Sequence, residues 1–66
     1  MNKFPETLKL YRKAEKISQV KLAEICKVSQ GTIAKWENGY QEPDIDTLIL
    51  LSNILGITID ELVGKQ

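Results

Sequence analysis

Two short stretches with helical spacing lie very close together near the middle of this 66-residue chain. The first covers residues 19–26, and Ser29, a residue type favoured at helix N-termini, opens the second after only Lys27 and Val28. So short a connection makes two helices cross steeply, at roughly 90–120°. We therefore expect a tight two-helix unit over residues 19–38, against which the rest of the chain has to pack.

The apolar residues of this unit occur where two crossed helices need them. Small Ala23 suits the closest approach of the helices, and Gly39 follows the second helix, where a helix end favours a positive φ. The side chains expected to point inward are Leu22, Ala23, Cys26, Val28, Ile33 and Trp36. A polar outward face then remains on the second helix, made by Gln30, Gly31, Ala34 and Lys35, with Thr32 beside them.

The rest of the chain also predicts helices, and no stretch alternates as a strand would. Pro5 suits a first helical turn and Gly56 a helix end, while Thr58 and Glu61 have capping-box spacing. The further helices are predicted over residues 5–15, 46–55 and 58–63. In the first of them the expected inward side chains are Leu8, Tyr11 and Ala14. Together these patterns predict an all-α fold, a compact five-helix bundle that forms a single domain over residues 1–66.

Composition narrows the classes of function. The chain has no His and a single cysteine, Cys26, so an internal disulfide is excluded and a zinc site is not expected. No apolar run reaches the length of a membrane span, and the N-terminus has no apolar signal core. No phosphate-binding glycine loop and no nucleophile–base pair is visible. We expect no enzyme, no cofactor, no small-molecule ligand, and a cytoplasmic location.

Charge is unevenly distributed along a chain whose net charge is zero. Residues 1–36 carry eight Lys and Arg against three Glu, whereas residues 37–66 carry one Lys against six Asp and Glu. An ordinary solvated surface is one interpretation of this segregation. The other is one positive and one negative face, of which the positive face would attract nucleic acid.

The sequence from Gln19 to Gly39 resembles the helix-turn-helix of the phage repressor and Cro family, the XRE-type regulators. Residues 8–12 and 17–19 are similar to the family's first helix and its entry to the second, and residues 43–62 to its last two helices. The resemblance covers about residues 6–63. It implies a lambda-repressor-like fold and a transcriptional regulator, a repressor that binds double-stranded DNA as a dimer on a palindromic operator.

The resemblance also implies contacts for individual residues. Gln19 would contact the DNA backbone and support a base-reading Gln30, and Asn38 would hold a phosphate. The positions that face bases and adjacent phosphates are Ser29, Gln30, Gly31, Thr32 and Lys35. A Gln side chain can pair with adenine, and Lys can reach guanine or a phosphate. The alternatives are ordinary ones, namely solvated helix residues at Gln30 and Lys35 and a simple helix end at Asn38.

Two further residues match a structural pair. Arg12 and Glu37 occupy positions that in relatives form a partly buried ion pair between the first and third helices. The resemblance therefore gives them a role in holding the helices together, not in chemistry.

Three residues depart from the family's pattern. Lys27 stands where the turn usually has glycine, so it must adopt a left-handed backbone at a cost of roughly 1 kcal/mol or more, and it would point at a phosphate. Gly31 costs a helix up to about 1 kcal/mol against alanine and removes a side chain where many relatives read a base. Glu42 opposes a phosphate contact in its loop. Modest affinity per protomer is expected, which favours a dimer.

The predicted fourth helix has more apolar residues than one core stripe accommodates, and Leu10 is surplus on the first helix. We expect a homodimer through the region of the fourth and fifth helices, with Leu50, Leu62 and Val63 as candidate contacts. Packing within one monomer is the alternative. The rival function is an antitoxin or other interaction module whose main partner is a protein, because the acidic second half and the surplus apolar residues would serve it.

Overall fold

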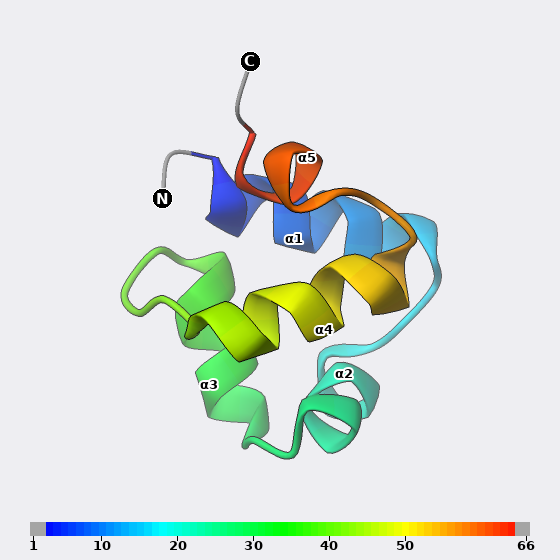
Figure 1. Ribbon diagram of the computed structural model, residues 1–66. Helices are drawn as coiled ribbons and strands as arrows, with labels where there is room; N and C mark the ends of the chain where they lie inside the picture. The colour runs from blue at the N-terminus through cyan, green and yellow to red at the C-terminus, as the bar shows by residue number, and fades with distance from the viewer. Residues whose placement is uncertain (1–2, 65–66) are drawn as a thin grey trace.

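The computed structural model describes residues 3–64, and these form five α-helices around a single core (Figure 1). The helices are α1 (Phe4–Ala14), α2 (Gln19–Cys26), α3 (Gln30–Glu37), α4 (Ile45–Leu55) and α5 (Ile59–Val63). The predicted all-α class and five-helix order are confirmed, and the described residues contain no strand. The bounds of α2 are the predicted ones, and the other helices differ from prediction by a residue or so at their ends.

Every helix contributes at least one fully buried side chain to the core. These are Phe4, Leu8, Leu22, Ile33, Leu51 and Leu62. Burying a side chain of this size contributes about 1.5–3 kcal/mol, which a domain this small depends on. Two expectations about the core were wrong. Ala14 is exposed because α1 ends there, and Phe4 was overlooked because it precedes the proline taken as the start of the helix.

Side-chain caps define the starts of four helices. The hydroxyl of Ser18 accepts from the amide of Lys21 at 3.0 Å, and that of Ser29 accepts from Thr32 at 3.1 Å. Asp44 caps α4 by accepting from the Thr47 amide at 2.9 Å, so the helix begins at Ile45, one residue earlier than expected. Thr58 and Glu61 form the reciprocal capping box of α5. Each cap satisfies a backbone N–H that would otherwise lack a partner within the helix.

The turn between α2 and α3 has the backbone expected of it. Lys27 is left-handed, with φ 59° and ψ 42°, and Val28 then donates its amide to the Ala23 carbonyl at 3.0 Å. A second lysine, Lys16, has the same φ of 59° at the end of α1, which the sequence did not indicate. Because neither residue is glycine, both turns are strained by roughly 1–2 kcal/mol.

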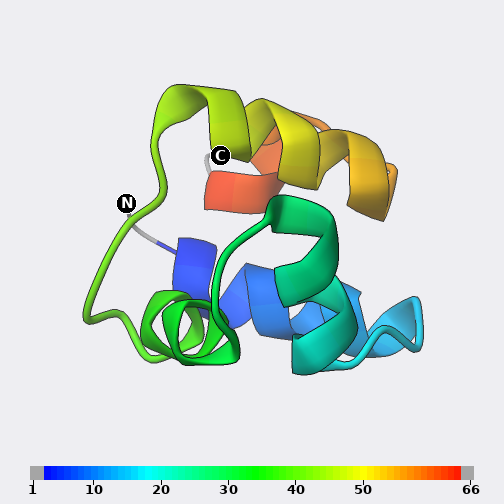
Figure 2. The ribbon, with the colours of Figure 1, turned by 90° about the horizontal axis from the view of Figure 1, so that it is seen from below.

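Helices α4 and α1 lie on opposite sides of the molecule, and α5 packs against both of them, while α3 packs on α1 and α2 packs on α3 and α4 (Figure 2). The two ends of the described chain meet, because the Lys3 amide donates to the Val63 carbonyl at 3.1 Å. Leu62 is fully buried between these ends. The expectation that Leu62 contributes to a dimer surface is therefore wrong, since its side chain is needed to close the core. Among residues 3–64, no helix is long and apolar enough to span a membrane.

Candidate nucleic-acid interface

Helix α3 has one buried side and one exposed side. Ile33, Trp36 and Glu37 point into the molecule, and they fix how the helix is rotated about its axis. The exposed side carries Gln30, Gly31, Lys35 and Asn38, with Thr32 and Ala34 partly exposed at its margin. Figure 1 shows α3 at the edge of the bundle beside α2, so this side is not covered by another helix. A helix held in this way, with polar side chains facing outward, fits the major groove of DNA.

A buried ion pair joins α1 to α3. Arg12 Nε donates to Glu37 Oε2 at 2.6 Å and Arg12 Nη2 donates to Glu37 Oε1 at 3.2 Å. The third guanidinium nitrogen, Nη1, donates to the carbonyl of Ile17 at 2.7 Å. Only 7% of Arg12 and 8% of Glu37 is exposed, so little water reaches the two charges. Their hydrogen bonds to each other and to the Ile17 carbonyl take the place of water. The pairing fixes α3 against α1 and against the start of α2.

Two glutamines extend this ion pair to the exposed side of α3. Gln19 Nε2 donates to Glu37 Oε1 at 3.1 Å, and Gln30 Nε2 donates to Gln19 Oε1 at 3.3 Å. The chain of contacts therefore runs from Arg12 in the core to Gln30 at the surface. A glutamine amide has two N–H groups and a carbonyl, so the bond to Gln19 leaves Gln30 able to pair with adenine through its other N–H and its carbonyl. The orientation of Gln30 is set before any ligand arrives.

Ser29 and Thr32 engage each other rather than pointing freely outward. Their hydroxyl oxygens are 2.9 Å apart, and the Ser29 oxygen also accepts from the Thr32 amide at 3.1 Å. These bonds stabilise the first turn of α3, whose positive end favours an anion. Both residues therefore define where the helix starts, while keeping hydroxyl groups at the surface.

Gly31 has no steric reason to be glycine. Its φ is not positive, and a Cβ atom added to it would meet only the Ser29 hydroxyl, at an ordinary 3.7 Å. The fold would accept a side chain there, and glycine makes the helix less stable at this position than alanine would.

Asn38 and Lys27 lie on either side of α3 along the chain. Asn38 is the C-cap of α3, with φ −98° and ψ 0°, and its side chain is exposed. Gly39 follows with φ 79°, and Tyr40 donates its amide to the Lys35 carbonyl at 2.9 Å, which ends the helix. Lys27 is exposed in the turn before α3. The predicted contact residues thus all come from α2, α3 and their connections, and none of them is fully buried.

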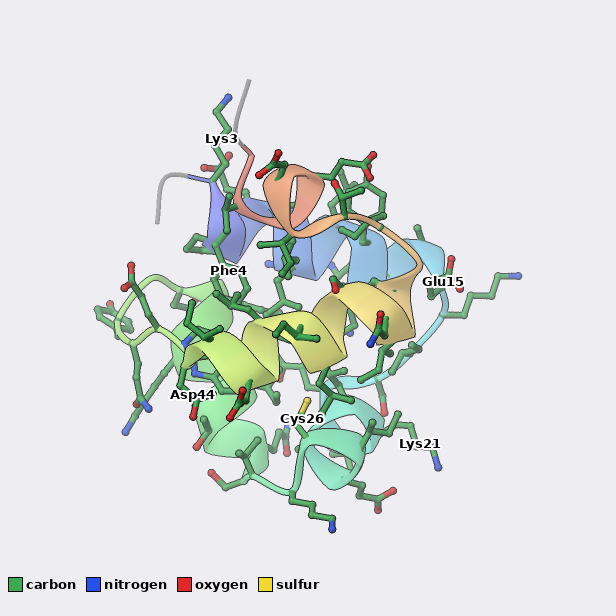
Figure 3. The ribbon with its side chains drawn as sticks, viewed as in Figure 1. Lys3, Phe4, Glu15, Lys21, Cys26 and Asp44 are labelled. Atoms are coloured by element: carbon green, nitrogen blue, oxygen red, sulfur yellow. The ribbon has the colours of Figure 1, made fainter. Side chains whose placement is uncertain are left out.

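The segment after α3 is acidic, in contrast to Lys27 and Lys35, which lie before and on α3. Asp44 and Asp46 are exposed at the start of α4, and hydrogen bonds from Thr47 lower the pKa of the Asp44 carboxyl below its ordinary value. An ionised Asp44 disfavours a phosphate at this helix end. The thiol of Cys26 points from α2 toward α4 (Figure 3), and burial raises its pKa, so it stays protonated and acts as a core residue.

The sequence did not reveal the bond between Gln19 and Glu37. These residues are 18 positions apart, and nothing in their local spacing indicates that they meet. The bond is informative because it connects the structural pair with the candidate base-reading residue.

No group of three possible metal-ligating side chains occurs among the described residues.

Comparison with known proteins agrees with this arrangement. Residues 8–62 match the family described as helix-turn-helix. The chain is 38% identical over 63 residues to the HTH-type transcriptional activator BcrR of Enterococcus faecalis. The aligned region covers 96% of this chain and 31% of the activator. The chain spans between about a third and somewhat over half of the length of the first curated relatives that it matches.

Solved structures share the fold. The P22 c2 repressor in complex with a synthetic operator superposes with a TM-score of 0.86 at 32% identity, covering 96% of both chains. Hydroxypropylphosphonic acid epoxidase from S. wedmorenis also superposes, with a TM-score of 0.82 at 33% identity, over 89% of this chain and 31% of the enzyme. The fold therefore occurs as a repressor domain and also as one part of an enzyme. By the match over residues 8–62, this chain belongs to the helix-turn-helix family that includes the XRE-type regulators and phage repressors.

Proposed function

We propose that this chain binds double-stranded DNA in a sequence-specific way and regulates transcription as a repressor in the bacterial cytoplasm. The observation that carries the proposal is the chain of contacts Arg12–Glu37–Gln19–Gln30, which runs from a buried ion pair to the exposed side of α3. A surface glutamine rarely benefits the fold by being held in this way, because side-chain ordering costs entropy. The cost is explained if Gln30 has to meet a base edge.

The proposed contacts divide into two kinds. Gln30 reads adenine in the major groove, with Gly31 and Thr32 close to the neighbouring bases. The α2 N-terminus with Gln19, together with Lys27, Ser29, Lys35 and Asn38, contacts phosphates, and these contacts fix the position of α3 without choosing the sequence. Counterion release by the lysines supplies much of the affinity. No catalytic step is part of the proposal.

A second copy of the chain completes the proposed DNA-binding unit. Leu50 is 38% exposed and Val63 is partly exposed, so both are available for a twofold contact through the α4–α5 region, whereas Leu62 is not. A twofold dimer places two recognition helices about 34 Å apart, which matches successive major grooves on one side of a palindromic operator.

The test starts by selecting bound sequences from a random duplex pool, because the operator is unknown. Affinity for the selected site is then measured for Q30A and K35A at two salt concentrations. Q30A should lose about 1–3 kcal/mol of discrimination at one base position. K35A should weaken binding to all sequences alike. It should also reduce the slope of log affinity against log salt concentration by about 1, which corresponds to the loss of one phosphate contact.

Matched controls are available on other surfaces. Asn53 lies on α4 and Lys9 on α1, both exposed, so N53A and K9A should leave DNA affinity nearly unchanged. Circular dichroism should show native helix content in all four variants. Unchanged binding in both Q30A and K35A would refute the assignment of α3 to the groove. Failure of the wild-type chain to bind duplex DNA at low salt, with tight binding to a cellular protein, would favour the interaction module instead.

A further inference from the structure

The outer face of α4 exposes isoleucines beside acidic residues. Ile45 is 68% exposed and Ile49 is 44% exposed, and because they are four residues apart they share one face of the helix. Asp46 is exposed one turn before Ile49. We refer to Ile45, Asp46 and Ile49 as the acidic apolar face.

The outer face of α1 has the complementary composition. Leu10 is 65% exposed, although the neighbouring core position Leu8 is fully buried, so Leu10 points away from the core. Lys9 and Lys13 are exposed beside it, and Lys13 lies one turn after Leu10. We refer to Lys9, Leu10 and Lys13 as the basic apolar face. The acidic apolar face thus has two isoleucines and the basic apolar face one leucine, each near a charge one turn away. The exposed Glu6 lies one turn before Lys9, but the two lysines leave the basic apolar face with a net positive charge.

The two faces cannot meet within one molecule. Helices α4 and α1 lie on opposite sides of the fold (Figure 2). The uneven charge of the sequence, +5 over residues 1–36 and −5 over residues 37–66, is consistent with this separation. A surface that exposes isoleucine next to aspartate is best covered by a partner that offers an apolar side chain next to a lysine.

We propose that the acidic apolar face of one copy of this chain docks against the basic apolar face of another. The occupant is a second copy because the same chain carries both complementary surfaces. Such a contact is head-to-tail, not twofold, since it pairs different surfaces, and it leaves a free face at each end of the pair. It differs in symmetry from the proposed twofold dimer, which uses Leu50 and Val63, and because Leu50 lies one turn after Asp46 the two contacts compete for α4. It does not depend on DNA binding.

The contact is small, so its affinity in free solution is low. Exposed charge pairs contribute only about 0.2–1 kcal/mol each, and three exposed apolar side chains add a limited area. Its effect grows when two copies are held near each other, as on adjacent sites of one DNA molecule, because tethering raises the effective concentration. The inference therefore predicts association that rises with protein concentration and falls with salt.

The test measures mass by sedimentation across protein concentration, without DNA, in a V63Q background, which weakens the proposed twofold contact without changing α4. In this background the chain should associate at low salt and form species larger than a pair. Adding D46K or K13E should each weaken association by at least about tenfold, because like charges replace an attraction. A 1:1 mixture of the two variants should recover association, since the unchanged basic apolar face of D46K can bind the unchanged acidic apolar face of K13E.

The control is K21E, which reverses a lysine on α2 outside both faces. The Lys21 side chain points into solvent and forms an exposed ion pair with Glu24 at 3.9 Å (Figure 3). It should associate like its parent. A chain that stays monomeric at high concentration and low salt would overturn the proposal. So would D46K and K13E variants that associate undiminished, or a mixture that pairs no better than either variant alone. None of these outcomes bears on DNA binding by α3, which is measured separately.

Discussion

The two halves of this molecule use different means to hold their helices. In α1–α3 a polar chain of contacts passes through the interior, from Arg12 and Glu37 to Gln19 and Gln30. In α4 and α5 the buried side chains are apolar except for Ser52, whose hydroxyl donates to the Ile49 carbonyl of the same helix at 2.8 Å, and the other side-chain bonds cap the helix starts at Asp44 and Thr58. Polar contacts depend on direction, so the first half fixes the orientation of a surface residue. Apolar burial does not, so the second half mainly supplies stability and surface.

The largest expected effect is in the polar half. Replacing Glu37 with alanine removes the carboxylate that pairs with Arg12 and leaves a buried guanidinium without its partner. We expect the free energy of unfolding to fall by about 3–5 kcal/mol. Chemical denaturation followed by circular dichroism measures this loss. Glu24, which forms an exposed ion pair of 3.9 Å with Lys21, is the matched control, and E24A should change stability by less than about 0.5 kcal/mol.

The apolar half should separate into buried and exposed leucines. Leu62 is fully buried, so L62A should lower the free energy of unfolding by about 2–5 kcal/mol. Leu50 is 38% exposed, so L50A should cost clearly less. Thermal and chemical denaturation compare the two variants directly. Equal losses would contradict the burial of the two residues, because Leu50 would then contribute as much to the core as the fully buried Leu62.

The two strained turns allow a gain in stability. Lys27 has φ 59°, a conformation that glycine adopts without steric cost, so K27G should raise the free energy of unfolding by about 1 kcal/mol. K16G, at the same φ, should give a similar gain, and K21G inside α2 should give a loss instead. Melting temperatures measure all three. A loss in K27G would show that the lysine side chain stabilises the turn by more than its backbone costs.

The smallest effect concerns the cap of α4 and depends on pH. Hydrogen bonds from Thr47 lower the pKa of Asp44 below its ordinary value of 3.8. A group whose pKa is lower in the folded state stabilises above its unfolded pKa and loses that contribution as pH falls through the folded pKa. We expect the melting temperature to fall more steeply below about pH 4 in the wild-type chain than in D44N, whose asparagine caps without titrating. Parallel curves would contradict this.

Local signals account for what the sequence predicted well. The bounds of α2 follow from Ser18 and from the left-handed turn at Lys27, both of which are encoded within a few residues. The exposed side of α3 follows from the burial of Ile33 and Trp36, which are one turn apart. These features do not require knowledge of distant contacts, so a reading of spacing and caps identifies them.

Nonlocal packing accounts for what the sequence did not reveal. Leu50 and Leu62 are both apolar residues on short helices, and periodicity over so few turns does not say which of them meets the core. The left-handed Lys16 has no glycine or asparagine to mark it. The bond between Gln19 and Glu37 depends on how α2 and α3 cross. The residues of this site could be predicted from the sequence, but the hydrogen bonds that connect Glu37, Gln19 and Gln30 could not.

The junction of the chain ends has a consequence for connectivity. The Lys3 amide bonds the Val63 carbonyl, and a Cβ atom added to Gly64 would lie 2.4 Å from Lys3 Cβ, so backbone from both ends is in close contact. A short peptide could therefore join the ends, and the chain could be reopened in the loop between α3 and α4 with every helix kept intact. In such a permuted protein the polar chain of contacts would remain whole, since all its members precede the new opening. The order in which the helices are synthesised would change, while the surface that α3 presents would not.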